Sequence, residues 1–281
     1  MAIPLSIAII LKRCFVMVLM GMTVVACSRV ELAYENADWV GAWRIGDYLD
    51  LHEEQKDRLR DGLSVYQAFH RQNRLPVINH FLDDVDQLLG KSNPDRATVN
   101  QLFIEGEAIV RSNVSDVTPL ATALLRELNH EQIDTLAATL EEGRNTYVER
   151  LTQGREQRVI DRSEAWLGAV TNDQQNTLTQ CVAEMPDVTE EWQDWRRQTE
   201  RTLVAMLRDN APQAQVEDFV QGWMLEDAAR SPVLQDYRQT SRDLWRRCTH
   251  TLISGLSADQ RQHARQRLAR YRGDLETVAA K

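Results

Sequence analysis

Leu128-Asn129-His130-Glu131-Gln132 is one of four related stretches that mark expected helix starts along this chain. The others are Leu51-His52-Glu53-Glu54-Gln55, Val170-Thr171-Asn172-Asp173-Gln174 and Leu256-Ser257-Ala258-Asp259-Gln260. In the three with Asn, Thr or Ser at the second position, that side chain can cap a helix while the glutamine reaches back to the cap N–H. An acidic side chain in the first turn also stabilises a helix, because it lies at the positive end of the helix dipole. These stretches therefore predict helix N-termini.

The segments between these starts have the apolar spacing of amphipathic helices. Leu59, Leu63 and Tyr66 recur at intervals of three and four, as do Val99 and Leu102. No run of alternating β-branched residues indicates a strand, and Gly and Pro are sparse. The sequence therefore predicts an all-α fold. Breaks are expected at residues 90–94, around 118–119, and at 185–186, 210–212 and 231–232.

The spacing of the four helix starts suggests a duplication. Their first and third glutamines are 119 residues apart, and the second and fourth are 128 apart. Between these marks the same order recurs, with amphipathic helices on either side of a proline-containing break. Convergent capping chemistry is the alternative explanation. We expect two tandem helical-bundle halves, residues 51–167 and 168–281.

A single long helix is expected to join the halves. Residues 131–167 contain no proline, and Gly143 and Gly154 are their weak points. If continuous, such a helix spans about 55 Å at 1.5 Å per residue. It would form a spine shared by both halves.

Residues 1–26 have the pattern of a secretory signal. Lys12 and Arg13 precede an apolar run over 15–25, which is shorter than the ~20 residues of a membrane-spanning helix. The run ends in Val24-Val25-Ala26-Cys27, which resembles the lipobox of bacterial lipoproteins. The resemblance implies cleavage before Cys27 and attachment of diacylglycerol, usually with a third acyl chain such as palmitate. An ordinary signal peptide with a chance cysteine is the alternative.

The resemblance to lipoproteins also implies a location. In enteric-type sorting, Asp after the lipidated cysteine retains a lipoprotein in the inner membrane, and this chain has Ser28 there. Two or more acyl chains make anchoring stable. We therefore expect a membrane-anchored protein on the periplasmic face of the outer membrane.

The charge of the chain argues against nucleic acid as a partner. The signal segment holds two basic and no acidic residues, so the remainder has 31 basic and 42 acidic side chains, a net charge of −11. Two cysteines remain after Cys27, namely Cys181 and Cys248. In an oxidising periplasm an isolated pair is a disulfide candidate. Two buried thiols are the alternative.

Residues 27–50, between the anchor and the first helix start, are expected to form a tether. They contain Glu31-Leu32-Ala33-Tyr34, Asn36, Asp38-Trp39 and Asp47-Tyr48-Leu49-Asp50-Leu51. With the lipobox, these motifs resemble an uncharacterised family of proteobacterial, all-helical lipoproteins that bear only a domain-of-unknown-function label. The resemblance implies an all-helical lipoprotein and brings no activity.

Aromatic and acidic side chains of the tether are the candidate binding residues. They are Trp39, Trp43 and Tyr48, flanked by Asp38 and Asp47. The favoured interpretation is a strap whose aromatics dock on the helical body. The functional alternative is a recognition surface for an envelope protein, because aromatics are enriched at binding hot spots.

No motif for catalysis, a metal or a cofactor is apparent. His52-Glu53 and His130-Glu131 invite comparison with H-E-x-x-H, but lysine and aspartate hold the second ligand position. No G-x-S-x-G elbow, phosphate-binding loop or C-x-x-C pair is present. Asp83, Asp84 and Asp86 fit a solvated helix face. We expect no enzyme and no metal site.

Arginine-rich stretches are the remaining candidates for binding. Trp195-Arg196-Arg197 and Trp245-Arg246-Arg247 could grip a glycan, a headgroup or a partner through cation–π contacts. More often such tryptophans face the core. Arg261, Arg265 and Arg272 lie near one face of the last helix, and pairing with the acidic first half is their favoured interpretation.

The sequence therefore predicts a protein that binds rather than catalyses. The first hypothesis is an envelope adaptor or assembly factor with a protein partner. The second is a carrier of a lipid or other apolar ligand in a groove between the halves. The third is an enzyme acting on envelope polymers, whose mark would be a buried carboxylate of raised pKa in a cleft.

Overall fold

The computed structural model describes residues 29–152 and 154–281. Within them the chain forms twelve α-helices, one short 3-10 helix and no strand, so the all-α prediction is confirmed. In chain order the elements are α2 (Arg29–Glu35), α3 (Ala37–Leu49), α4 (Glu53–Asn73), α5 (Leu75–Gly90), α6 (Arg96–Arg126), α7 (His130–Thr152), α8 (Arg155–Leu167), α9 (Asn172–Ala183), α10 (Thr189–Arg208), α11 (Gln213–Leu225), η2 (Asp227–Ala229), α12 (Pro232–Ser254) and α13 (Ala258–Ala279).

The four predicted helix starts begin α4, α7, α9 and α13. At α7, Asn129 Oδ1 accepts a hydrogen bond from the backbone N–H of Gln132 at 2.9 Å, and Gln132 Oε1 accepts one from the N–H of Asn129 at 3.1 Å. Threonine and serine caps repeat this arrangement at α9 and α13. At α4, Gln55 Oε1 accepts from the N–H of His52 at 3.0 Å. Local capping chemistry thus sets where these helices begin.

The capping glutamines also pair with one another. Gln55 and Gln132 are buried and exchange two hydrogen bonds, at 3.2 and 2.7 Å between amide nitrogen and oxygen. Gln55 Nε2 donates further to the carbonyl of Glu127 at 3.0 Å, and Gln132 Nε2 to that of Asp50 at 2.9 Å. Each glutamine amide therefore accepts a hydrogen bond from the N–H at its own helix start and donates one to a backbone carbonyl just before the other helix start.

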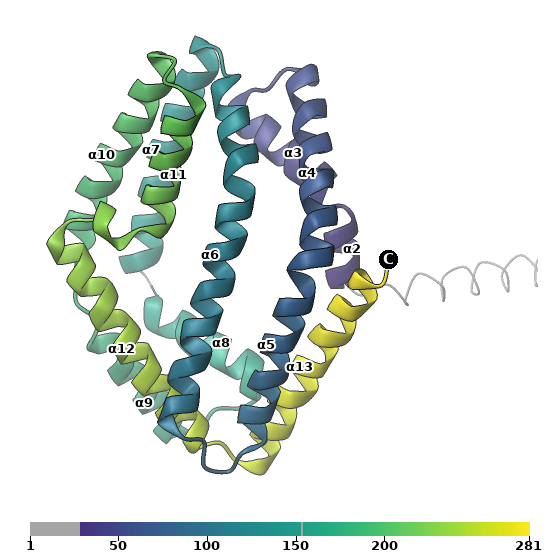
Figure 1. Ribbon diagram of the computed structural model, residues 1–281. Helices are drawn as coiled ribbons and strands as arrows, with labels where there is room; N and C mark the ends of the chain where they lie inside the picture. Colours follow the sequence, from purple (N-terminus) through teal and green to yellow (C-terminus); the bar gives the residue numbers. More distant parts are fainter. Residues whose placement is uncertain (1–28, 153) are drawn as a thin grey trace, which may run out of the picture.

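A second glutamine pair repeats the arrangement. Gln174 and Gln260 exchange hydrogen bonds at 2.9 and 2.8 Å. Gln174 Nε2 donates to Gly255 O at 3.3 Å, and Gln260 Nε2 donates to Ala169 O at 2.8 Å. The starts of α4 and α7 lie at one end of the molecule and those of α9 and α13 at the other (Figure 1).

The helix α6 connects these two ends. Its 31 residues span about 46 Å at 1.5 Å per residue. The hydrophobic cluster near its C-terminal end combines Leu124 and Leu136 with Leu203 and Val216. This core thus contains residues from both sides of position 167, so the two predicted halves share part of their hydrophobic interior.

One expected helix break is absent. The helix α6 continues through Thr118 and Pro119, although proline removes one backbone donor. Buried hydroxyls bond the carbonyls around it: Thr118 Oγ1 donates to Val114 O at 2.7 Å and Thr122 Oγ1 to Thr118 O at 3.0 Å. The breaks expected at 90–94, 185–186, 210–212 and 231–232 are confirmed.

The expected continuous helix over 131–167 is instead two helices, α7 and α8. Gly154 precedes α8 with φ of 63°, a left-handed conformation that costs glycine little. The prediction was wrong because the absence of proline does not guarantee continuity through such a glycine. The longest helix is α6.

The expected tether is part of the folded body from Arg29 onward. Ala42, Gly46 and Leu49 are buried on the inner face of α3. A Cβ at Gly46 would lie 2.9 Å from Cε of Lys56, so glycine lets α3 approach α4 closely. Cys27, Ser28 and the predicted signal lie outside the described residues.

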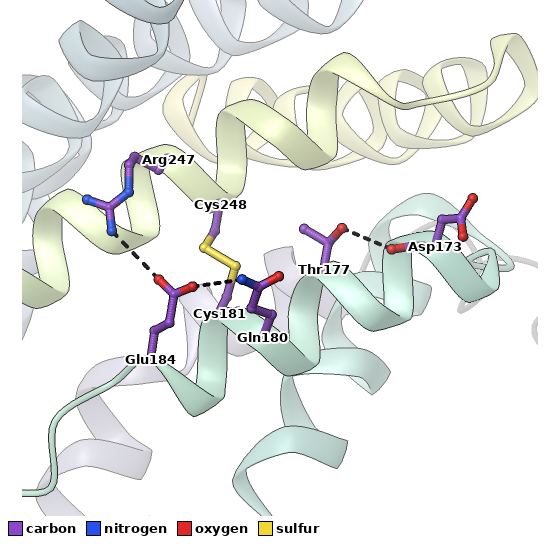
Figure 2. Close-up of a disulfide and its surroundings, with 7 residues drawn as sticks. All are labelled: Asp173, Thr177, Gln180, Cys181, Glu184, Arg247 and Cys248. Atoms are coloured by element: carbon purple, nitrogen blue, oxygen red, sulfur yellow. Dashed lines mark hydrogen bonds and ion pairs between the residues drawn. A yellow bond between two sulfur atoms is a disulfide. The ribbon is translucent and has the colours of Figure 1, made fainter.

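A disulfide joins Cys181 of α9 to Cys248 of α12 (Figure 2). The Cα atoms are 6.3 Å apart, inside the ~4.4 to 6.8 Å range for a bridge. Figure 2 also shows Arg247 reaching Glu184, the C-cap residue of α9, with 3.9 Å between Nη2 and Oε2. The helix α12 is therefore fastened to α9 by a covalent bond and an ion pair.

Replacing Gln132 with methionine should lower the free energy of unfolding by about 2 to 5 kcal/mol. The apolar side chain removes the partner amide of Gln55 and leaves the carbonyl of Asp50 and the N–H of Asn129 without their hydrogen bonds, and each such group costs ~1 to 3 kcal/mol. Thermal unfolding followed by circular dichroism measures the effect. Gln101→Met on the exposed surface of α6 is the matched control, with an expected change below ~0.5 kcal/mol. Equal midpoints for both variants would contradict the role of the pair.

Reducing the disulfide should add two hydrogens to the intact mass and lower the unfolding midpoint. The bridge closes a loop with a sequence separation of 67, for which chain entropy predicts a stabilisation of about 4 kcal/mol. The double variant Cys181→Ser/Cys248→Ser should show the same lowered midpoint with or without reductant. An intact mass that reductant leaves unchanged would show that the bridge does not form.

Candidate functional site

A groove with a volume of about 1000 Å³ lies between α5 and α6 on one side and α11 and α12 on the other. This is the upper end of the ~300 to 1000 Å³ found for small-molecule sites. The first two helices belong to residues 51–167 and the other two to 168–281. Figure 1 shows these four helices on one face of the molecule. Apolar side chains that line the groove include Phe81, Leu82, Val85, Leu102, Phe103 and Ile109.

The groove changes from apolar to charged along its length. The helices α6 and α12 run antiparallel along the groove. Val99 of α6 and Ile253 of α12 therefore lie at one end of it, and Arg111 of α6 and Arg238 of α12 lie at the other. Val99 and Ile253 pack in the same hydrophobic cluster. The other end carries Arg111, Arg238 and Glu107. Such a site has separate places for an apolar chain and a polar head.

The carboxylate of Asp227 in η2 organises the charged end. Arg238 Nε lies 2.6 Å and Arg242 Nη1 2.7 Å from its oxygens, and Arg230 Nη1 lies at 3.4 Å. Arg242 Nε also donates to Glu107 at 3.2 Å. Burial would raise the pKa of Asp227, but the hydrogen bond from Arg242 and the charge of Arg238 hold that pKa below its usual range.

Positive charge is crowded at this end. Burial and the neighbouring guanidinium of Arg238 lower the pKa of Arg230. The hydroxyl of Ser241, which lines the groove, and Nε of Arg246 are buried without a hydrogen-bond partner in the part of the chain that the structure describes. Five arginines here share four carboxylates among the described side chains, namely Arg111, Arg230, Arg238, Arg242 and Arg246 with Glu107, Glu226, Asp227 and Asp243.

The candidate residues of the predicted tether lie on α3, away from the groove. Trp39, Trp43 and Tyr48 are 56%, 53% and 54% exposed, so the favoured interpretation of docked aromatics is wrong. The rings of Trp39 and Trp43 stack on each other, with centroids 6.4 Å apart. Asp38 lies 3.9 Å from Nε of Arg60, and Asp47 is exposed.

The basic last helix pairs within the molecule, as its favoured interpretation predicted. Arg265 Nη2 lies 2.8 Å from Asp86 Oδ2, and Arg272 Nη2 lies 2.5 Å from Asp83 Oδ1. The hydrogen bond from Arg265 lowers the pKa of Asp86. Arg261 donates to backbone carbonyls at the end of α5, including Leu89 O at 3.3 Å. These pairs fasten α13 to α5.

Other carboxylates and histidines that could take part in catalysis or metal binding serve structural roles. Glu200 is buried and outside the groove, where Arg196 Nε lies 2.6 Å from its Oε1 and Arg144 forms an ion pair with its Oε2. His52 and His130 stand at helix starts. Within 29–152 and 154–281, no three His, Cys, Asp or Glu side chains are placed to hold a metal ion. No helix of the same residues has the length and apolar character to span a bilayer.

Sequence reasoning did not single out the arginines of the groove as a site. Arg238 and Arg242, which line the groove, recur with Arg246 every four residues and so lie on one face of α12, which was a usable signal; only Arg246, which is not in the lining, was named from the sequence. Asp227, the shared partner of Arg238 and Arg242, lies outside that helix, so only the fold reveals the cluster.

Comparison with known families gives one match. The model of a family of unknown function, DUF6279, matches residues 47–228, which is more than half of the chain. No curated protein and no solved structure matches significantly. The chain therefore belongs to the DUF6279 family of unknown function.

Proposed function

We propose that this DUF6279 member binds an anionic amphiphile, a fatty acid or a lipid with an acidic headgroup, in the groove between α5–α6 and α11–α12. The change from apolar to arginine-rich lining along one continuous groove carries the proposal. A purely apolar ligand would leave the arginine end unused, and a small anion would leave the apolar end unused. An amphiphile with a negative head uses both.

The apolar end accounts for the tail. Phe81, Leu102 and Phe103 present rings and branched chains to the groove, and the apolar lining continues to Val110 and Met224, which are exposed close to Arg111. Contiguous exposed apolar surface of this kind marks binding grooves. Covering it with an acyl chain gains ~25 cal/mol for each Å² of apolar surface removed from water.

The charged end accounts for the head. The guanidinium fork of arginine binds carboxylate and phosphate oxygens in pairs, and such hydrogen bonds are about twice as strong as neutral ones. Arg238 and Arg242 line the groove, with Ser241 between them in the sequence. A bound anion would offset the like charges that crowd Asp227 and would offer the hydroxyl of Ser241 an acceptor.

We further propose that the chain acts from the periplasmic face of the outer membrane, anchored through acyl chains on Cys27. The lipobox and Ser28 support this location. A groove of this polarity favours carriage or sequestration of a lipid over a reaction, and no catalytic step is assigned to the chain. An adaptor role toward an envelope protein stays a prediction from the sequence.

Oleate and oleyl alcohol, which share a tail and differ in the head, are the probes that test the proposal. Each is titrated into the full chain, and displacement of the fluorescent reporter 1-anilinonaphthalene-8-sulfonate reports binding. Oleate should bind at least ~10-fold more tightly than the alcohol, which corresponds to about 1.4 kcal/mol. Equal affinities would contradict a role for the arginine end.

Two pairs of variants locate the site. Val110→Trp places a large ring in the groove and should weaken oleate binding ~10-fold or more, whereas Val65→Trp, at a position 71% exposed on α4, should not. Arg238→Gln should weaken oleate and spare the alcohol. Arg208→Gln, which removes an arginine from the exposed pair with Asp134, is its control. Oleate binding unchanged by Val110→Trp would place the ligand elsewhere.

A further inference from the structure

The outer surface of α3 carries large apolar side chains that remain about half exposed among residues 29–152 and 154–281. Five of the fourteen large apolar side chains that are exposed in the described residues lie within 32–48. Three of them, Trp39, Val40 and Trp43, form what we call the aromatic face of α3. Its two indole rings lie nearly parallel, with an interplanar angle of 9°. Burying a large apolar patch of this kind requires a partner surface.

The aromatic face points outward because the opposite side of α3 packs against the hydrophobic core. Ala42 and Leu49 are buried in the main hydrophobic cluster, and Ile45 packs against it. Those residues hold α3 in place while the aromatic face stays in contact with solvent. The face is therefore rigidly presented, and its exposure is a consequence of how α3 packs.

We propose that the aromatic face of α3 docks on the lipid bilayer in which Cys27 is anchored. Tryptophan concentrates at membrane interfaces because its ring is apolar and its N–H can bond headgroups and water. This inference rests on the proposed lipidation and is independent of the groove. It orients the folded body on the membrane.

The distance from the anchor supports a bilayer as the occupant. One residue, Ser28, separates Cys27 from the first residue of α2. Because a residue spans at most ~3.6 Å, the start of α2 stays within about 10 Å of the lipidated cysteine. Trp39 follows Arg29 by ten positions through α2 and the first turn of α3, a path of about 15 Å if taken at helical rise. The anchor thus confines the aromatic face to the neighbourhood of the membrane.

The charges beside the face select the kind of surface. Asp38, Asp47 and the C-cap residue Asp50 accompany Arg44, so α3 and its C-cap carry a net negative charge, which Arg60 and Lys56 of α4 partly offset. An anionic headgroup layer would be repelled, as would an acidic protein. The face therefore fits a zwitterionic interface, which it enters through its rings rather than through charge.

Photo-crosslinking in living cells tests the inference. A photoreactive phenylalanine replaces Trp43 in the full chain, and adducts are identified by mass spectrometry. The same residue at Trp166, which is 40% exposed on α8, is the matched control. We expect lipid adducts at position 43 in at least ~10-fold excess over position 166.

Three outcomes would overturn the docking proposal. A single dominant protein adduct at position 43 would make the face a protein-binding surface. An absence of adducts at position 43 would leave the face unoccupied, and equal lipid adducts at 43 and 166 would show no preferred orientation. A photoreactive residue at Trp39 supplies a second position, and an unfolding midpoint equal to that of the parent chain shows that each variant is folded.

Discussion

Two buried glutamine pairs determine which helix N-termini lie side by side at each end of the molecule. Each amide caps its own helix, bonds the partner amide and takes up a carbonyl of the partner's loop, as Gln132 does with Asp50. A buried polar group is costly unless all of its hydrogen bonds are made, so the pairing fixes which helix starts meet. One pair closes each end of the molecule, and α6 runs between them. The pairs also hold the chain just after two of the groove helices, because Gln55 bonds the carbonyl of Glu127 after α6 and Gln174 that of Gly255 after α12.

The part of the fold that depends on local chemistry could be predicted from the sequence. Capping boxes located four helix starts, and the spacing of apolar residues predicted an all-α protein. The same capping glutamines also pair over distances of 77 and 86 residues, which no local pattern encodes. The continuity of α6 through Pro119 and the break at Gly154 were likewise not encoded by the presence or absence of proline.

The candidate site likewise combines features that the sequence indicates with features that only the fold reveals. The sequence suggested a ligand groove between the halves but named no residue in it, because the lining side chains come from four helices that only the fold assembles. The aromatic residues of α3 were found by composition alone. Their exposure was not, since it depends on which side of α3 contacts α4.

The disulfide links the fold to the proposed function. Cys248 lies on α12 between Trp245 and Thr249, both of which line the groove, so the bond to α9 holds one wall in place. A fixed wall reduces the ordering cost of binding. A groove fixed in this way, on a body anchored beside a bilayer, would be placed to receive an amphiphile from that membrane.

The central claim is that the groove holds an anionic amphiphile. The most direct measurement is a native mass spectrum of the full chain, extracted gently from its own cells and compared with the spectrum of the denatured protein. A bound amphiphile should appear as a non-covalent mass that is lost on denaturation and that fragments as a fatty acid or acidic lipid, in addition to the acyl chains on Cys27. A native mass equal to the denatured one would contradict it.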